Sequence, residues 1–524
     1  MNTPDNIEAI YPLSPMQQGM LFHSLYTPES GVYFEQLCFT LHGDLDVAAF
    51  ERAWQSLIDQ HPVLRTVFAW ETRDKPLQVV RRHAALPWTT HDWRDLSPDA
   101  QQSKLAAWLK SDQTRGFDLH QAPLMRVTLF RLADETWRCV WSFHHLLLDG
   151  WSLSLALKDV FAFYEASRQG QDLRLPPPRP YRDYIAWLHA QDLKEAETFW
   201  RETLCGFTAP TSLHVQRVAE ANPAADDYAE QQVRLSTATT TALHAFARQQ
   251  RVTLNTVIQG AWAALLSRYS GEPSDEVDVL FGATIAGRPA ALDGVEAMIG
   301  LFINTLPARV HVPDDGALGP WLQTLQAQQA AARRYEYAQL VDIQRWSDVP
   351  QGQALFDTLL VFENYPGEAD VQPADPRLSI ADMVTLEKTN YPLTVIVEPG
   401  EELRLRISYR RQRFTDDAIA RMLGHLRTLL EGMLTAPESA PGDLPLLTPA
   451  EREQILVAWN DTRTDYPRET PVHRLFEAQA AQTPDAVALS FEGATLTYAE
   501  LNRRANRLAH HMRELGVGPE VGVG

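Results

Sequence analysis

The chain is poor in basic residues and in cysteine, and each shortage excludes a class of protein. Its 47 lysines and arginines stand against 67 aspartates and glutamates, which gives a formal net charge of −20. Nucleic-acid backbones and anionic membranes would be repelled by this charge, so neither is expected as a partner. The three cysteines (Cys38, Cys139 and Cys205) are too few and too scattered for a disulfide framework or a cysteine-type zinc site.

Long apolar runs are also missing. No stretch approaches the roughly 18 consecutive apolar residues that a membrane helix needs. The segment Met1 to Ile10 carries acidic residues and lacks the basic and apolar regions of a secretory signal. Together with the low cysteine content, these absences predict a soluble protein of the reducing cytoplasm.

The composition that remains is that of an ordinary globular protein. Of the 524 residues, 45% are hydrophobic and 22% are charged, which excludes disorder, collagen and coiled coil. At roughly 150 residues per domain, the length predicts about three domains or two large ones. Helix-type and strand-type patterns alternate, which predicts an α/β (α+β) fold. Helices are expected over 46–58, 152–168, 254–269 and 415–434, and strands over 63–68, 136–143, 277–285, 302–310, 354–362, 393–397 and 403–409.

Two proline-rich stretches predict the domain boundaries. The first, Leu-Arg-Leu-Pro-Pro-Pro-Arg-Pro at 173–180, is a stiff connection between an N-terminal lobe, 1–172, and a C-terminal lobe, 173–435. The second lies in a linker, 436–470. Residues 471–524 then show helix, strand and helix signals and stop at Gly524, in the middle of an expected strand.

The sharpest local feature is the heptapeptide His144-His145-Leu146-Leu147-Leu148-Asp149-Gly150, at the end of a predicted strand. Adjacent side chains on a strand point to opposite faces, so one histidine can face a cleft while the other packs inward. That alternation, without a third or fourth ligand nearby, argues against a metal site. A lone histidine would usually be a hydrogen-bonded core residue, but here the spacing of the whole heptapeptide is informative.

This heptapeptide resembles the HHxxxDG active-site motif of condensation domains of nonribosomal peptide synthetases, relatives of chloramphenicol acetyltransferase. Five other segments resemble further motifs of that family, in the family's order: 14–23, 61–66, 181–184, 299–307 and 355–365. Together they cover about residues 9 to 440. The resemblance implies two chloramphenicol acetyltransferase-like lobes, each a mixed sheet flanked by helices, in a V-shaped pseudo-dimer with a central tunnel.

The tail carries a second resemblance. Leu496-Thr497-Tyr498-Ala499-Glu500-Leu501 is similar to the first core motif of the adenylation domain that usually follows a condensation domain. The later nucleotide-binding motifs are not in the chain. Residues 471–524 are therefore expected to be the truncated start of an adenylation domain, unable to catalyse amino-acid-dependent ATP–pyrophosphate exchange, in a fragment of a larger synthetase.

The resemblance implies amide formation between two thioesters. The α-amine of an acceptor aminoacyl thioester attacks the carbonyl of a donor aminoacyl or peptidyl thioester. Both arrive on phosphopantetheine arms of upstream (donor) and downstream (acceptor) peptidyl carrier domains, so the chain itself is expected to bind no cofactor and no metal. The remaining adenylation domain is a further expected partner, and a monomer is expected. Segments 11–23 and 356–365 are similar to the subtype that takes a donor with a D-configured C-terminal residue and an L-acceptor.

The resemblance also assigns roles to the heptapeptide. His145 is the candidate that accepts the ammonium proton, because an imidazole suits proton transfer at neutral pH; alternatively it only hydrogen-bonds the amine or the oxyanion. His144 is the structural histidine. Asp149 is expected to pair with Arg288 of the second lobe, and a triad with His145 is the alternative. Gly150 permits a turn at which a side chain would obstruct the channel.

Other positions have weaker assignments. Trp151 and Asn304 are candidates to line the tunnel, with plain core packing as the alternative, and Arg65 is expected to be structural. Among competing functions, heterocyclisation domains carry aspartates in place of the histidines. The main alternatives are an epimerisation domain and a catalytically silent condensation-like recruitment module. The adenylation-like tail argues against a further alternative, a free-standing acyl-CoA acetyltransferase.

Overall fold

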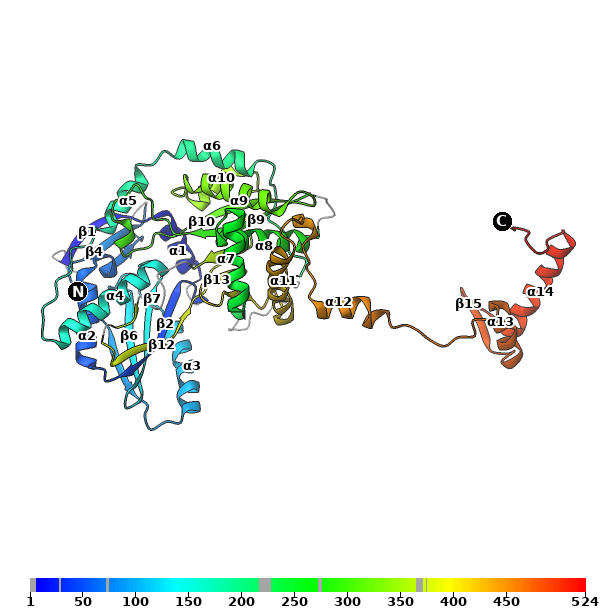
Figure 1. The fold of residues 1–524 in the computed structure, drawn as a ribbon, viewed down its shortest axis with the longest axis horizontal. Coiled ribbons are helices and arrows are strands. Elements are labelled where there is room, and N and C mark those ends of the chain that lie inside the picture. Colours follow the sequence, from blue (N-terminus) through cyan, green and yellow to red (C-terminus); the bar gives the residue numbers. More distant parts are fainter. Residues whose placement is uncertain are drawn as a thin grey trace. The chain divides into compact units, whose positions relative to one another are not determined.

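A computed structural model describes residues 6–27, 30–71, 75–215, 228–271, 276–363, 371–373 and 375–524. The chain divides into two compact units, Met1–Thr448 and Pro449–Gly524 (Figure 1). The end of the first unit lies inside the expected linker 436–470, and the expected division at residue 172 stays a prediction. In the described part of the chain, no helix is long and apolar enough to cross a membrane.

The N-terminal half of the large unit is built on a five-stranded mixed sheet in the order β12-β2-β7-β6-β5. All its pairs are antiparallel except β5 with β6. Its strands are β2 (Phe34–Gly43), β5 (Trp88–Asp92), β6 (Met125–Ala133), β7 (Thr136–His144) and β12 (Leu378–Leu386). A three-stranded sheet holds β1 (Ile7–Pro12), β3 (Thr66–Ala69) and β4 (Leu77–Arg81). The helices are α1 (Pro15–Tyr26), α2 (Val47–Gln60), α3 (Pro98–Arg115) and α4 (Gly150–Arg168).

The C-terminal half repeats this style with a six-stranded mixed sheet in the order β10-β9-β11-β13-β14-β8. Its strands are β8 (Tyr228–Arg234), β9 (Glu276–Ile285), β10 (Asn304–Pro313), β11 (Thr358–Phe362), β13 (Leu393–Glu398) and β14 (Arg404–Arg410). Its helices are α5 (Tyr181–His189), α6 (Leu193–Leu204), α7 (Thr237–Gln250), α8 (Leu254–Tyr269), α9 (Leu318–Arg333), α10 (Leu340–Trp346) and α11 (Asp416–Thr435). The predicted α/β class with mixed, helix-flanked sheets is therefore confirmed.

Buried apolar residues explain why the helices lie on these sheets. In α2, Phe50, Trp54 and Leu57 recur at helical spacing and are fully buried. Trp54 packs edge-on against Trp141 of β7, with ring centroids 4.9 Å apart. Asp46 begins α2 because its carboxylate accepts the Ala49 N–H at 2.9 Å.

One strand crosses from the second half into the first. Strand β12 pairs antiparallel with β2, from Leu378 opposite Gly43 to Leu386 opposite Gln36. Gly43 has φ +126°, and a Cβ there would lie 1.8 Å from the carbonyl oxygen of Arg377. The crossing therefore requires glycine at this position. Residues 387–391, which follow β12, lead back to β13 in the second sheet.

Some predicted elements shift in the structure. The expected strand over 63–68 is a 3-10 turn at Pro62–Arg65 followed by β3, because Pro62 sets a turn conformation and the Leu64 N–H donates to the His61 carbonyl. The strand expected over 354–362 begins only at Thr358. The helices expected over 152–168, 254–269 and 415–434 agree with α4, α8 and α11 within a few residues.

The small unit contains α12 (Pro449–Leu456), α13 (Val472–Gln482), β15 (Val487–Phe491), β16 (Ala494–Thr497) and α14 (Tyr498–Glu514). Strands β15 and β16 form an antiparallel hairpin. Helix α14 begins with a capping box, in which Thr497 and Glu500 each accept the backbone N–H of the other. The two predicted helices of the tail and the strand between them are confirmed, whereas the strand expected at the end of the chain is not formed, since residues 521–524 have no regular secondary structure.

Candidate active site

The two histidines stand where β7 ends, and they point to different surroundings. His144 is 6% exposed; its Nδ1 accepts the Leu146 N–H at 3.2 Å, and its Nε2 lies 3.3 Å from the Ser24 hydroxyl. Burial, together with the neighbouring charge of His145, lowers the pKa of His144 to about 3. His144 is therefore a neutral, hydrogen-bonded residue of the interior.

His145 faces a cavity. Its Nδ1 lies 2.8 Å from the carbonyl oxygen of Leu148. A carbonyl only accepts hydrogen bonds, so Nδ1 carries the hydrogen and Nε2 of the neutral ring presents a lone pair. Among the described residues, the His145 ring has no other hydrogen-bond partner. The site thus holds a fixed imidazole with a free proton acceptor.

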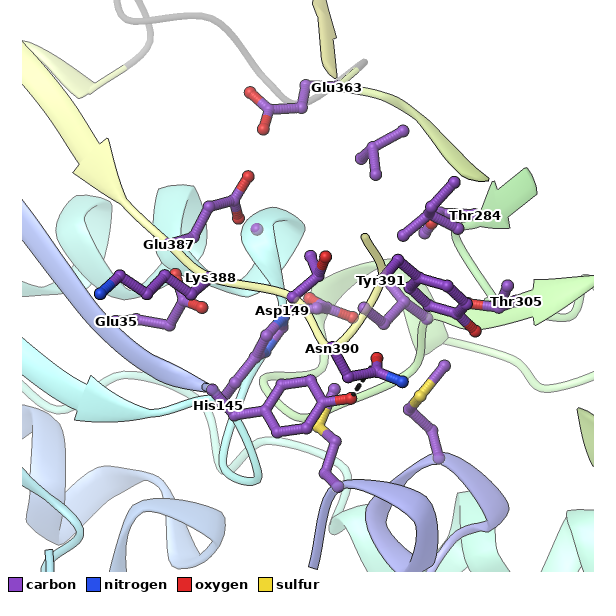
Figure 2. A pocket seen from close by; sticks show the side chains of 18 of the residues that line it. Glu35, His145, Asp149, Thr284, Thr305, Glu363, Glu387, Lys388, Asn390 and Tyr391 are labelled. Atoms are coloured by element: carbon purple, nitrogen blue, oxygen red, sulfur yellow. Dashed lines mark hydrogen bonds between the residues drawn. The ribbon is translucent and has the colours of Figure 1, made fainter. Parts of the chain in front are cut away.

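The cavity that His145 lines has a volume of about 1000 Å³ and takes its walls from both halves of the large unit. Helix α1, β2 and the heptapeptide contribute from the first half, and β9, β10, β11 and β14 from the second. Residues 387–391, after the crossing strand β12, also line it (Figure 2). The hydroxyl of Tyr33, the residue before β2, donates to Asn390 Oδ1 at 2.9 Å and so joins the start of β2 to that segment.

Asp149 caps α4 and joins the two halves. Its Oδ1 accepts the Ser152 N–H at 2.9 Å and the Ser152 hydroxyl at 2.8 Å. Its Oδ2 accepts the Phe302 N–H at 2.9 Å, and Arg288 Nη2 lies 3.3 Å from Oδ1. No hydrogen bond joins Asp149 to His145 within the described ranges, since both carboxylate oxygens and His145 Nδ1 have other partners.

Arg288 is buried beside Asp149, with its side chain 4% exposed. It donates to the carbonyls of Val295 at 2.5 Å and Met298 at 2.9 Å. Its guanidinium lies 4.1 Å from the ring centroid of Phe302 and 5.4 Å from that of Trp151. Burial lowers the pKa of Arg288, and the Asp149 carboxylate opposes this effect. The expected pairing of Asp149 with Arg288 is therefore present as a buried contact between residues of the two halves.

The two tunnel candidates have different positions. Asn304 lines the cavity, and its amide donates to the carbonyls of Glu336 at 2.7 Å and Ala338 at 2.9 Å. Trp151 is not among the described residues that line the cavity. Its indole N–H donates to the Glu296 carbonyl at 3.0 Å, which turns the ring toward Arg288 instead.

Arg65 and Gly150 have distinct surroundings. Arg65 is buried, donates to the carbonyls of Ile58 and Asp59 at the end of α2 at 2.5 and 2.6 Å, and pairs with Glu8 at 2.8 Å. Gly150 begins α4 and lines the cavity. Arg65 therefore stabilises the end of a helix away from the cavity, whereas Gly150 borders it.

Five glutamates in the cavity wall were missed by the sequence reasoning: Glu35 of β2, Glu230 of β8, Glu363 after β11, Glu387 after β12 and Glu398 of β13. Arg406 of β14 lines the cavity beside them. The available signal was an acidic side chain within a segment of strand-forming residues, as at Glu35, but no motif links these positions. Within the described residues, no group of three or more histidine, cysteine or acidic residues has the arrangement to hold a metal ion.

Comparison with known proteins decides the family. The Condensation domain profile matches residues 7–456, and the AMP-binding enzyme profile matches residues 476–524. The chain belongs to the condensation-domain family of nonribosomal peptide synthetases. The reaction of this family is peptide-bond formation. The second match confirms that the tail is the start of an AMP-binding domain.

Sequence relatives of this condensation domain are large synthetases. It is 47% identical to each of two subunits of the linear gramicidin synthase of Brevibacillus parabrevis, over 99% of this chain and 7% of one relative or 10% of the other. It is 40% identical to a chondramide synthase of Chondromyces crocatus, over 99% of this chain and 15% of that protein. It is 34% identical to surfactin synthase subunit 3 of Bacillus subtilis (strain 168), over 98% of this chain and 40% of that protein. The chain therefore spans less than half the length of each of these relatives.

Solved structures share the fold. A four-domain nonribosomal peptide synthetase bound to AMP and glycine superposes with a TM-score of 0.75 at 17% identity, over 98% of this chain and 39% of that one. The first condensation domain of the calcium-dependent antibiotic synthetase gives 0.70 at 15% identity, over 84% of this chain and 100% of that one. The X-domain from teicoplanin biosynthesis superposes with a TM-score of 0.70 at 22% identity, over 85% of this chain and 99% of that one.

Proposed function

We propose that this condensation domain joins a donor aminoacyl or peptidyl thioester to the α-amine of an aminoacyl thioester acceptor, with both substrates held on phosphopantetheine arms of upstream and downstream carrier domains. The observation that carries the proposal is the lone pair of His145 Nε2, directed into a cavity with walls from both halves of the unit. That cavity has room for two reacting ends.

The chemistry needs little besides position and proton transfer. A thioester is already activated, so the amine can attack its carbonyl without ATP. Holding the two ends together supplies several kcal/mol of the barrier. As the C–N bond forms, the nitrogen loses protons, and His145 Nε2 is the acceptor placed to take one. His145 is thus proposed as the catalytic residue.

The buried pair Asp149–Arg288 is proposed as a positioning device. Asp149 holds the start of α4 and the Phe302 N–H of the second half at once. The His145–Leu148 hydrogen bond lies within the same turn. A shift of this turn would move the imidazole relative to both substrates, which lowers the rate without removing a reacting group.

We also propose that the donor ends in a D-configured residue and that the acceptor is an L-residue. Support comes from the resemblance of segments 11–23 and 356–365 to that subtype and from the 46–47% identity to three linear gramicidin synthase subunits. Of the second segment, Asn364 and Tyr365 lie outside the described residues. Matched D- and L-donors should differ at least about tenfold in turnover; equal turnover would contradict the assignment of configuration alone.

A condensation assay tests the proposal directly. The chain is mixed with one carrier loaded with a donor and a second loaded with an acceptor, and intact-protein mass spectrometry follows the mass of each carrier. The acceptor carrier should gain the donor mass only when this chain is present. An epimerisation domain would instead exchange the donor α-hydrogen in D₂O without an acceptor, and a silent recruitment module would leave both carriers unchanged.

A further inference from the structure

Glu35 of β2, Glu363 directly after β11 and Glu387 directly after β12 line the cavity together and are here called the carboxylate cluster. In Figure 2, Glu387 lies between Glu363 and Glu35, on the side of the cavity where His145 stands. The side chains of Glu363 and Glu387 are each 20% exposed, and the space they face is the cavity. The cluster therefore lines the same cavity as His145, the proposed catalytic residue.

Glu35 is the unusual member of the cluster. Its residue is 4% exposed, and its carboxylate has no hydrogen-bond or ion-pair partner in the part of the chain that the structure describes. A buried carboxylate without a partner is costly as an anion, so it favours a bound proton or a positively charged ligand. Burial raises the pKa of Glu35, and the charges of Glu387 and Glu363 raise it further against the effect of Arg406.

The guanidinium of Arg406 is a positive charge near the other two carboxylates, but it does not form a hydrogen bond with either. Arg406 Nη2 lies 3.8 Å from Glu363 and 3.9 Å from Glu387, beyond hydrogen-bonding range. Its close partners are Glu398 at 2.6 Å and Glu230 at 2.9 Å. The cluster is therefore incompletely neutralised. Burial, with the charge of Glu387, raises the pKa of Glu363 to about 8.

The cavity that His145 and the cluster line also has an exposed carboxylate in its wall. Burial raises the pKa of Glu387, and the charge of Arg406, followed by that of His145, opposes this effect. Glu230, the close partner of Arg406, is exposed. Carboxylates thus line the same cavity as the imidazole, and one of them is exposed to solvent. The titratable and charged groups that face the cluster are Tyr33, His145, Glu230, Lys388, Tyr391, Glu398, Arg404 and Arg406.

We propose that the carboxylate cluster takes up the proton that the acceptor ammonium must lose before it attacks, and passes it to solvent at Glu230. This inference rests on the proposed condensation reaction. The ammonium gives one proton to His145 Nε2, which passes it to Glu387 and the cluster. The neutral amine then forms the C–N bond, the C–S bond breaks, and the departing thiolate takes the second amine proton to become a thiol.

Single-turnover condensation from pH 6 to pH 9 tests this role in the full chain with two loaded carriers. Glu35→Gln and Glu387→Gln each remove one proton acceptor while keeping the size of the side chain. In these variants His145 has one carboxylate fewer to which it can pass the proton, so more of the reaction starts from amine that has already lost its proton to solvent, and that form is scarcest at low pH. The wild-type rate should exceed each variant's about tenfold at pH 6 and by less than about twofold at pH 9.

Glu336→Gln is the matched control, because Glu336 is another partly buried carboxyl with a raised pKa, caused by burial, and lies outside the cluster. Its pH profile should follow the wild type. A ratio that stays constant across pH for both cluster variants would show a structural role and overturn the proton site. Failure of the wild-type chain to condense at any pH would instead overturn the condensation reaction itself.

Discussion

Asp149 and Arg288 are separated by 139 residues in the chain and meet at 3.3 Å, with side chains 1% and 4% exposed. The contact joins the turn that carries His145 to the second half of the large unit. Its carboxylate is shared among a helix start, a backbone N–H of the other half and the guanidinium. A single buried group thus stabilises a helix terminus and an interface together.

Replacing either member of this pair should destabilise the protein strongly. Asp149→Ala leaves the Arg288 charge buried and unpaired, which costs about 3–5 kcal/mol of unfolding free energy, and Arg288→Ala should resemble it. Asp46→Ala is the control, because Asp46 is an exposed helix cap with no ion pair to the described residues, and its loss costs about 1 kcal/mol. Denaturant unfolding measures all three. The prediction would be wrong if the Asp149→Ala protein were as stable as wild type and as inactive as His145→Ala. Asp149 would then take part in catalysis.

His145→Ala should leave the fold intact and remove the reaction. No described side chain forms a hydrogen bond with the imidazole, so the unfolding temperature should stay near that of wild type. Condensation should slow by about 10²–10⁴-fold, the scale of a lost acid–base group. His120→Ala, at a histidine stacked on Trp70 outside the cavity, should keep full activity. If His145→Ala slowed condensation by less than tenfold, His145 would not act as the proton acceptor and would only form hydrogen bonds to the substrates.

Stability should fall in mild acid because of His144. Its folded pKa is about 3, against about 6.5 when unfolded, so only the unfolded chain binds the proton between these values. The stability that the folded protein gains from keeping His144 neutral is fully present above pH 6.5 and is lost as the pH falls toward 3. From pH 7 to pH 5 it amounts to about 2 kcal/mol.

Urea unfolding of wild type and His144→Gln at pH 7 and pH 5 measures this effect. The variant does not titrate at this position, so its unfolding free energy should decrease less between the two pH values. His120→Gln, at an exposed histidine, should behave like wild type. Equal pH dependence in wild type and His144→Gln would show that His144 is protonated in the folded protein.

Glycine at position 43 should be essential for the crossing of β12. Gly43→Ala places a Cβ against the Arg377 carbonyl and strains a backbone at φ +126°, so we expect a loss of stability of at least about 2 kcal/mol. Gly19→Ala is the opposite control: it lies inside α1 with nothing within 4 Å of its added Cβ, so it should stabilise by up to about 1 kcal/mol. Thermal unfolding distinguishes the two.

Local chemistry explains why much of the architecture could be predicted from the sequence. Asp46 and Thr415 are hydrogen-bonding caps placed directly before apolar residues at helical spacing, and each begins a helix in the structure. The heptapeptide of His144 to Gly150 carries both the turn and the family resemblance. These features depend on residues close together in the chain, where spacing is itself the physical constraint.

Contacts between residues far apart in the chain determine the features that the sequence did not predict. The α/β class and the family followed from the sequence, because strand alternation and helix capping act within a few residues and the family motifs are short segments of chain. Only the tertiary structure decided that β12 joins the first sheet, that Trp151 turns toward Arg288, and that Glu35 and Glu387 share one wall. Those contacts join residues far apart in the chain, and their electrostatics depend on burial that no local pattern encodes.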